Sequence, residues 1–381
     1  MIVERLNLTD FRNYTEANVE LRPGPNVFVG SNGQGKTNLV EAIAFFATLG
    51  SHRVSMDAPM VRDGADYAIV RARLGHGERQ ISLDVQINKS GSNKARVNGA
   101  PVKTSELPRY AQVVLFAPED LTIVRGDPSA RRRFADQLLV QRTPRLSAVL
   151  GDYERVVKQR TALLKSARAR GLRADSLSTL DVWDDKLVAL GTQVINARAE
   201  MTSALASPLS SAYTSIAGAD HNPTASWSLS LHGDDDTPPQ EAMAISDIET
   251  AFRAALKNRR AAELERGVTL VGPHRDDLNL SIRNLPVKGY ASHGESWSVA
   301  LALRLASAEL LRADSRLGDP VLILDDVFAE LDVHRRTRLA DLVSAYEQVI
   351  VTAAVEADVP SALRAHTVRV EAGQISGDVS E

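Results

Sequence analysis

One short stretch of the sequence has the residue types and spacing of a phosphate-binding loop. It reads GSNGQGKT, follows the apolar run NVFV, and precedes a segment with helical periodicity. Glycines let backbone N–H groups close around phosphates, and the helix that follows adds the positive end of its dipole. The predicted cofactor-binding residues are Gly30, Ser31, Asn32, Gly33, Gln34, Gly35, Lys36 and Thr37. Lys36 would reach the β- and γ-phosphates and Thr37 would bind Mg²⁺, whereas the plain alternative is an ordinary Gly-rich turn.

Two adjacent carboxylates far downstream could complete such a site. Asp325 and Asp326 follow the apolar run VLIL, and a buried strand that ends in a carboxylate places it at the edge of the sheet where a phosphate loop lies. Asp325 would bind Mg²⁺ directly or through water, and Asp326 would orient or deprotonate an attacking water. The catalytic candidates are therefore Asp326, Lys36 and Asp325, and the metal candidates are Thr37 and Asp325. The alternative is that the two acids cap the next helix.

The distance between these motifs is the most informative feature of the chain. Lys36 and Asp325 are 289 positions apart, so a large insertion separates the two halves of the predicted site. A third motif lies about thirty residues before the Asp pair, where Ser292, Gly294 and Glu295 begin a segment with helical apolar spacing. A Ser-x-Gly turn at a helix start offers N–H groups and a hydroxyl to an anion, although by itself such a turn is usually a simple cap.

The surrounding pattern predicts an α/β protein that can position these groups. Short strands are expected within residues 2–29, and QISLDVQI alternates apolar and polar residues as a half-buried strand does. Asn98-Gly99 predicts a hairpin turn, and residues 129–206 have a helical pattern. The chain has 381 residues, 44% hydrophobic and 24% charged, with no cysteine and no apolar run of a membrane-span length, so a cytoplasmic protein without a membrane partner is expected.

Charge is unevenly distributed along the chain. The net charge is −3, but residues 125–173 contain thirteen Lys and Arg against four acids, a local charge of +9. Such a segment could bind nucleic-acid phosphates, or it could form solvated helix faces. The DNA-binding candidates are Arg131, Arg132, Arg133, Arg155, Lys158, Arg160, Lys165 and Arg168.

Six stretches, in order along the whole chain, resemble the RecF family of SMC-like ABC ATPases, which act in bacterial recombination repair. They are LTDFRNY (8–14), GSNGQGKTNLVEAI (30–43), FAPEDLTIVRGDPSARRRFAD (116–136), VGPHRDDL (271–278), SHGE (292–295) and DDVFAELD (325–332). The resemblance implies a two-lobed P-loop ATPase head with a mostly helical second lobe and no long coiled coil. Residues 1–128 plus 265–381 would form ATPase lobe I with an antiparallel β subdomain, and residues 129–264 would form helical lobe II.

The resemblance also implies how the site works. ATP and Mg²⁺ would be the cofactors, and ATP would drive homodimerisation, with Ser292, Gly294 and Glu295 closing over the γ-phosphate that the partner's loop holds. Asp332 would lie at the dimer interface, and Arg12 and Asn13 would approach the phosphate or ribose of the nucleotide. The implied function is an ATP-gated DNA-binding repair protein that recognises junctions of single- and double-stranded DNA and helps to load RecA with RecO and RecR.

Several residues depart from the usual ATPase pattern and predict slow hydrolysis. Asp326 stands where most ABC ATPases have Glu, Thr352-Ala353 stands where a His would sense the γ-phosphate, and Pro118-Glu119-Asp120 replaces an expected Gln. His274 could lie near the site or be a structural turn residue. We therefore expect a slow, DNA-stimulated ATPase that acts as a switch. The competing interpretations are a nucleotide-binding subunit of a membrane transporter and an ATP-gated DNA scaffold that does not hydrolyse.

Overall fold

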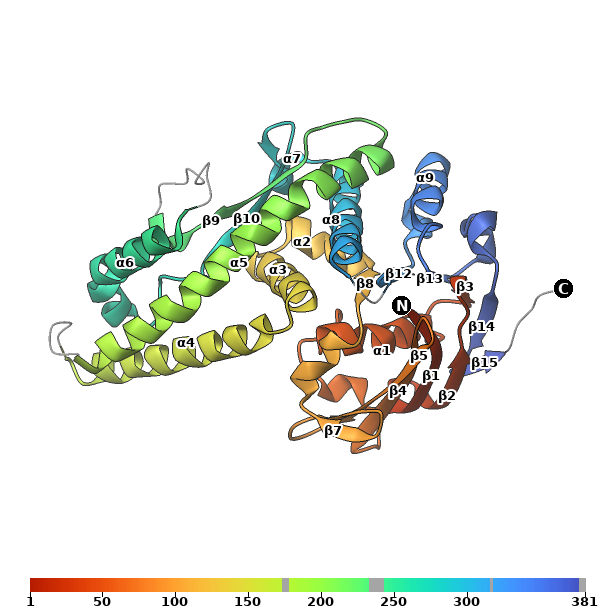
Figure 1. Ribbon diagram of the computed structural model, residues 1–381, viewed down its shortest axis with the longest axis horizontal. Helices are drawn as coiled ribbons and strands as arrows, with labels where there is room; N and C mark the ends of the chain where they lie inside the picture. The colour runs from red at the N-terminus through yellow and green to blue at the C-terminus, as the bar shows by residue number, and fades with distance from the viewer. Residues whose placement is uncertain (173–177, 233–242, 316–317, 377–381) are drawn as a thin grey trace. The chain divides into compact units, whose positions relative to one another are not determined.

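The chain folds into two compact units. The computed structural model describes all residues except 173–177, 233–242, 316–317 and 377–381. The first unit, here called the head unit, contains Met1–Leu121, Pro208–Asp220 and His293–Glu381. The second, here called the helical unit, contains Thr122–Ser207 and His221–Ser292. Figure 1 shows the elements of both units.

These boundaries differ from those that the sequence suggested near residues 128 and 265. Residues 265–292 belong to the helical unit, where β10 pairs with β9 along the register Leu278↔Trp227. The last turns of α5 belong to the head unit, where Arg338 Nη1 donates to Ile216 O at 3.4 Å. Hydrophobic periodicity marked the elements, but it contained no information about which of them pair.

The head unit contains an antiparallel sheet with the order β2-β1-β4-β5-β6-β7. Its alternating strands bury one face, and Leu83 and Val85 of β5 stand opposite Ala72 and Val70 of β4. Asn98 and Gly99 form the β6–β7 turn with φ angles of 50° and 80°, as the sequence predicted. The strand bounds are β1 Ile2–Phe11, β2 Tyr14–Glu20, β4 Tyr67–His76, β5 Arg79–Asn88, β6 Lys94–Val97 and β7 Ala100–Val102.

A second sheet of the head unit has the order β15-β14-β3-β13-β12-β8, and all its pairs are parallel except that of the edge strand β15. Its central strands are buried along their whole length, as expected for a parallel sheet covered on both faces. The bounds are β3 Gly24–Val29, β8 Val113–Phe116, β12 Val321–Asp325, β13 Gln348–Ala353, β14 Thr367–Glu371 and β15 Gln374–Ser376.

Helix α1 (Lys36–Thr48) fills the space between the two sheets. Ten of its residues are buried, and its apolar side chains share one core with strands of both sheets. Helix α8 (His293–Asp314) packs on β8, where Trp297 meets Phe116 edge to face at 5.2 Å, and α9 spans Val333–Val343. Short 3₁₀ helices complete the unit: η1 Ala58–Met60, η2 Thr104–Arg109, η3 Pro118–Asp120, η6 Phe328–Glu330, η7 Glu356–Asp358 and η8 Ser361–Leu363.

The helical unit is built mostly from helices, with one small antiparallel sheet of order β11-β10-β9. Its helices are α2 Leu121–Arg125, α3 Pro128–Arg142, α4 Leu146–Ala169, α5 Ser178–Ala217, η5 Ser230–His232, α6 Ile245–Arg266 and α7 Val287–Tyr290; α2 begins and α5 ends in the head unit. Its strands are β9 Thr224–Ser228, β10 Asp277–Ile282 and β11 Leu285–Pro286. Within the described residues, no helix combines the length and apolar character needed to cross a bilayer.

Candidate functional site

The predicted phosphate loop joins β3 to α1 at the edge where parallel strands end. Gly33 and Gly35 have φ angles of 81° and 117°, a conformation that side chains with a Cβ rarely adopt. Gly30 is required for space, because a Cβ there would lie 2.1 Å from the carbonyl oxygen of Val370. The loop geometry therefore depends on glycine at these three positions.

The loop lysine folds back over the loop. Lys36 Nζ donates to Gly30 O at 2.6 Å and to Ser31 O at 3.1 Å. Burial lowers the pKa of Lys36, while the nearby carboxylates of Asp326 and Asp325 act in the opposite direction. The hydrogen bonds of Lys36 to these backbone carbonyls are ones that an anionic phosphate could replace.

The two remote halves of the predicted site meet at a hydroxyl–carboxylate contact. Thr37 Oγ1 donates to Asp325 Oδ1 at 3.1 Å, and Thr352 Oγ1 donates to the same oxygen at 2.5 Å. Thr352 also accepts the N–H of Asp326 at 3.0 Å, because β12 and β13 pair in parallel with Asp325 opposite Thr352. Burial raises the pKa of Asp325, partly offset by the hydrogen bond from Thr352. Asp326 itself has a left-handed φ of 53°.

Two cavities adjoin this constellation. One of about 300 Å³ is lined by Gly33, Lys36, Thr37, Asp326 and Thr352, among others. A second of about 590 Å³ is lined by Arg12, Asn13, Pro59, Asp63 and Lys89, among others. Asn38 and Arg53 line both cavities. The arrangement suits a ligand with a phosphate chain at one end and a larger group at the other.

Two of the predicted contact residues, Asn13 and Gln34, hold the loop in place, and a third, Arg12, is held beside the larger cavity. Asn13 Nδ2 donates to Gln34 O at 3.1 Å, and Asn13 Oδ1 accepts from Asn38 Nδ2 at 2.7 Å. The Gln34 side chain accepts from the backbone N–H of Ala372, and Gln34 O accepts from Gly373 N at 3.2 Å. Arg12 is bound to Glu41 and to Pro59 O, and it lines the larger cavity. Gln34 thus ties the loop to the turn between β14 and β15.

The SHGE turn stands where helix α8 begins. Ser298 Oγ donates to Gly294 O at 2.9 Å, and Arg335 Nη1 lies 3.5 Å from the same oxygen. Asp332 caps α9 by accepting the N–H of Arg335 at 3.0 Å, which lowers the pKa of this exposed carboxylate. Gly294, Glu295 and Asp332 belong to the head unit, and Ser292 is the last residue assigned to the helical unit.

Three residues for which no role at this site was predicted lie around it. Strand β8 pairs in parallel with β12, so Glu119, which comes shortly after β8, lies at the same edge of the sheet as Asp325. Its negative charge adds to the effect of burial in raising the pKa of Asp325. His52 lowers the pKa of Asp325, and its buried Nε2 has no hydrogen-bond partner among the described residues. Arg53 donates to Asn38 Oδ1 at 2.9 Å. Only the position of Glu119 after the run VVLF gave a signal in the sequence.

Two of the predicted DNA-binding arginines lie in the interior, which corrects their expected place on a surface. Arg131 is 5% exposed and donates to Asp277 at 2.6 and 2.8 Å. Arg160 is fully buried and donates to Asp184 and Glu263 at 2.6 Å each. Charged side chains are buried where a paired acid compensates the lost hydration, and both arginines have such partners.

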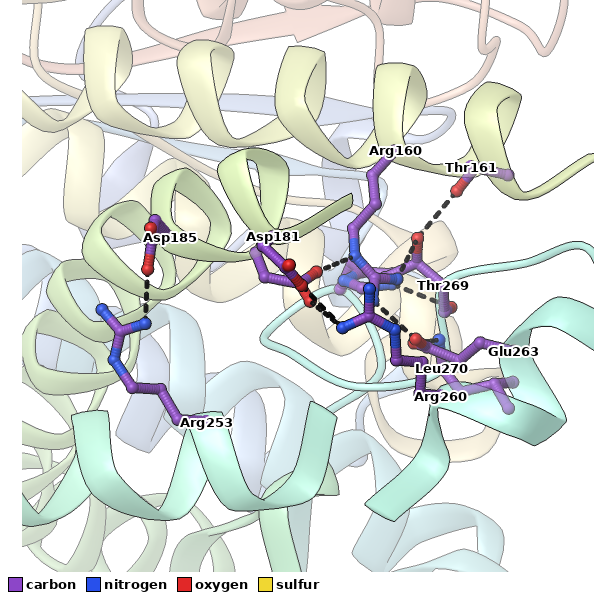
Figure 2. A network of polar contacts seen from close by, with 11 residues as sticks. Arg160, Thr161, Asp181, Asp185, Arg253, Arg260, Glu263, Thr269 and Leu270 are labelled. Atoms are coloured by element: carbon purple, nitrogen blue, oxygen red, sulfur yellow. Dashed lines mark hydrogen bonds and ion pairs between the residues drawn. The ribbon is translucent and has the colours of Figure 1, made fainter. Parts of the chain in front are cut away.

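Figure 2 shows that Arg160 lies at the centre of a polar network of the helical unit. The guanidinium also donates to Thr269 Oγ1 at 3.2 Å, and Thr269 contacts Thr161 at 2.9 Å. Glu263 accepts the N–H of Leu270 at 2.7 Å. This network joins α4, α5, α6 and the segment after α6, so Arg160 has a structural role.

His274 belongs to the same packing arrangement. Its Nδ1 lies 2.8 Å from Tyr153 Oη, and its Nε2 lies 3.2 Å from Thr269 O. Burial lowers the pKa of His274 to about 4, so the ring is neutral at physiological pH. Its contacts match the structural role that the sequence analysis kept open for this turn histidine.

The other basic candidates are accessible to different degrees. Arg132 is half-buried and donates to Asp276 O at 2.7 Å. The exposed side chains are Arg133, Arg155, Lys158, Lys165 and Arg168. Arg155 pairs with Asp152, whereas Lys158 and Lys165 lie on the side of α4 opposite its buried residues. Arg173, the last residue of the basic segment, lies outside the described residues.

Known proteins share both the sequence and the fold. Residues 2–376 match the family model of the RecF/RecN/SMC N-terminal domain. A DNA replication and repair protein RecF from Clavibacter sepedonicus is 59% identical, with 98% of this chain and 95% of the relative covered. Another with the same name, from Leifsonia xyli subsp. xyli (strain CTCB07), is 58% identical, with 98% and 99% covered.

Solved structures agree with this assignment. The recombination mediator protein RecF with ATP, in the RecFOR pathway, has a TM-score of 0.88 and 26% identity over 98% of this chain and 97% of that one. An Smc head bound to the C-terminal winged-helix domain of ScpA has a TM-score of 0.53 at 16% identity, over 99% and 96%, which shows the head fold alone. The fold expected from the sequence is confirmed, and the chain belongs to the RecF family of SMC-like ABC ATPases.

Proposed function

We propose that this chain binds ATP with Mg²⁺ at the phosphate loop of the head unit. The observation that carries this proposal is the contact of Thr37 with Asp325, which joins a P-loop hydroxyl to the terminal strand carboxylate at 3.1 Å. In P-loop proteins this pair holds the metal that bridges the β- and γ-phosphates. The relative named RecF–ATP supports the choice of nucleotide.

The donor set fits Mg²⁺. Asp325 is 2% exposed, and its burial raises its pKa, so a divalent cation beside it would favour the ionised form. No group of three or more His, Cys, Asp and Glu side chains suited to hold a metal occurs in the part of the chain that the structure describes. Mg²⁺ needs no such group, because it is commonly held by one or two carboxylates together with substrate phosphates and water.

The head residues support a slow ATPase that acts as a switch. Asp326 lines the smaller cavity and is the candidate to orient or deprotonate the attacking water. Its side chain is one carbon shorter than the Glu usual there, and Thr352 binds both Asp325 and the N–H of Asp326. These features are also compatible with the alternative function, an ATP-gated DNA scaffold that does not hydrolyse ATP. Single-turnover release of γ-phosphate, wild type against Asp326→Asn, distinguishes the two.

ATP would close a homodimer across the phosphate loop. A single loop covers one side of the triphosphate, and the SHGE turn at the start of α8 offers the N–H donors of a helix N-terminus. Ser292, Gly294 and Glu295 would bind the γ-phosphate that the partner holds, and the exposed Asp332 would lie at the interface. Sedimentation velocity tests this: wild type should dimerise with ATP, and Ser292→Arg should remain monomeric.

The gated activity would be binding of gapped DNA in replication and repair. The family assignment and the exposed basic side chains of α4 support DNA as the partner. Lys and Arg that contact phosphates read no sequence, so recognition would depend on the DNA structure, with junctions of single and double strands as the expected target. We further propose that the chain acts in the cytoplasm with RecO and RecR in loading RecA, and the family and the RecFOR pathway of the relative support this proposal.

A further inference from the structure

A buried carboxylate behind the two cavities connects residues that line them. Glu41 lies on α1 and is 0% exposed. It accepts from Arg12 Nε at 2.8 Å and from Arg12 Nη2 at 2.6 Å, and it also accepts from Ser51 Oγ. Burial alone would raise the pKa of Glu41, but the hydrogen bonds from Arg12 and Ser51 outweigh it and hold the pKa below its ordinary value. The carboxylate is therefore ionised at neutral pH.

The first path from Glu41 leads to Arg12. This residue has a left-handed φ of 55°, uncommon for a side chain with a Cβ, and its N–H donates to Met60 O at 2.8 Å. Its guanidinium uses three of five donors on Glu41 and on Pro59 O at 2.9 Å. Among the contacts of the described residues, two N–H groups thus remain for a ligand in the 590 Å³ cavity that Arg12 lines.

The second path leads to Arg53. Ser51 Oγ accepts the N–H of Arg53 at 2.9 Å and the N–H of Val54 at 3.1 Å, so it fixes the turn after α1. Arg53 lines both cavities and donates to Asn38 Oδ1 at 2.9 Å. One buried acid thus orients two cations from different segments toward the same space.

We propose that Glu41 is a positioning residue: it holds the guanidinium of Arg12 directly, and the turn of Arg53 through Ser51, so that both cations flank a nucleoside triphosphate in the phosphate loop. The inference rests on the proposed nucleotide binding. Glu41 has no surface on which to touch the ligand, so its effect passes entirely through Arg12 and Ser51. Preorganised cations bind a phosphate more tightly than mobile ones, because less side-chain entropy is lost on binding.

The test is a titration of the full chain with a fluorescent ATP analogue and Mg²⁺. Glu41→Gln keeps the size of the side chain and removes the charge. We expect its Kd to rise about tenfold, which corresponds to about 1.4 kcal/mol. Glu263→Gln is the matched control, because Glu263 is equally buried, accepts from Arg160 and lies in the helical unit. Glu263→Gln should lower the free energy of unfolding as Glu41→Gln does, while its Kd for the ATP analogue stays at the wild-type value.

A double-mutant cycle separates positioning from general damage. In an Arg12→Ala background, Glu41→Gln should raise the Kd by about twofold at most, because one of its two paths has been removed. Equal effects in both backgrounds, or a wild-type Kd for folded Glu41→Gln, would overturn the proposal. If Glu41→Gln does not fold, Ser51→Ala is the test, and an unchanged Kd for it overturns the proposal, which requires the path to Arg53 through Ser51. Failure of the wild type to bind the analogue would instead refute the proposed function.

Discussion

Removal of two lysines from α4 should change how DNA binding depends on salt. Lys158 and Lys165 are exposed and lie opposite the buried side of the helix, whereas Arg131 and Arg160 are enclosed in ion pairs. Each phosphate contact on duplex DNA contributes about 0.9 to the slope of log K against log salt. The five exposed candidates therefore give at most about 4.5 per protomer, of which Lys158→Gln/Lys165→Gln would remove about 1.8. At 0.1 M salt this difference corresponds to about 60-fold weaker binding.

The assay is fluorescence anisotropy of a labelled gapped duplex, with ATP and Mg²⁺, over a range of salt concentrations. The matched control is Lys94→Gln/Lys103→Gln, which removes the same charge from two exposed lysines of the head unit. The control should keep the wild-type slope, because its two lysines do not belong to the proposed α4 surface and net charge by itself adds no contact with a phosphate. If the α4 variant keeps the wild-type slope, or the control loses as much, the surface that we assign to DNA is wrong.

Three further outcomes are expected. Arg131→Ala should lower the free energy of unfolding by about 3 kcal/mol in a denaturant titration, because it leaves Asp277 without its partner, and Arg133→Ala should change it little. Asp325→Asn should abolish the Mg²⁺ dependence of ATP binding by calorimetry; retention of that dependence would contradict the proposed metal site. In the helical unit, His274 and Asp276 should make the free energy of unfolding depend on pH in opposite directions. The pKa of His274 is lowered to about 4, so its contribution is full above pH 6.5 and is lost as the pH falls toward 4. Burial raises the pKa of Asp276 to about 6, so its contribution is lost as the pH rises toward 6. The variant Asp276→Asn keeps His274, so its free energy of unfolding should rise by about 3 kcal/mol more between pH 4 and pH 6.5 than that of the double variant His274→Asn/Asp276→Asn. Urea unfolding at several pH values measures this, and the same pH dependence in both variants would rule it out.

The sequence alone predicted the local structure of the phosphate loop and of the strand that ends at Asp325. Glycine spacing and the apolar runs before Gly30 and Asp325 follow from local rules: a turn that needs positive φ, and a buried parallel strand that needs continuous apolar residues. Because parallel strands end at one edge, even the meeting of Thr37 with Asp325 across the long insertion could be predicted. Local pattern was sufficient wherever each residue's role depended on its own strand or turn.

Tertiary structure decided which charged residues are structural. Arg131 and Lys158 are both basic residues on helices of the same segment, but only packing places Arg131 against Asp277 and leaves Lys158 exposed. The partners of Arg12 and Gln34, which are Glu41 and the backbone of Ala372, come from other elements. Pairing of a charge with a distant acid depends on which helices and strands pack together, and the spacing of residues along a chain contains little of that information.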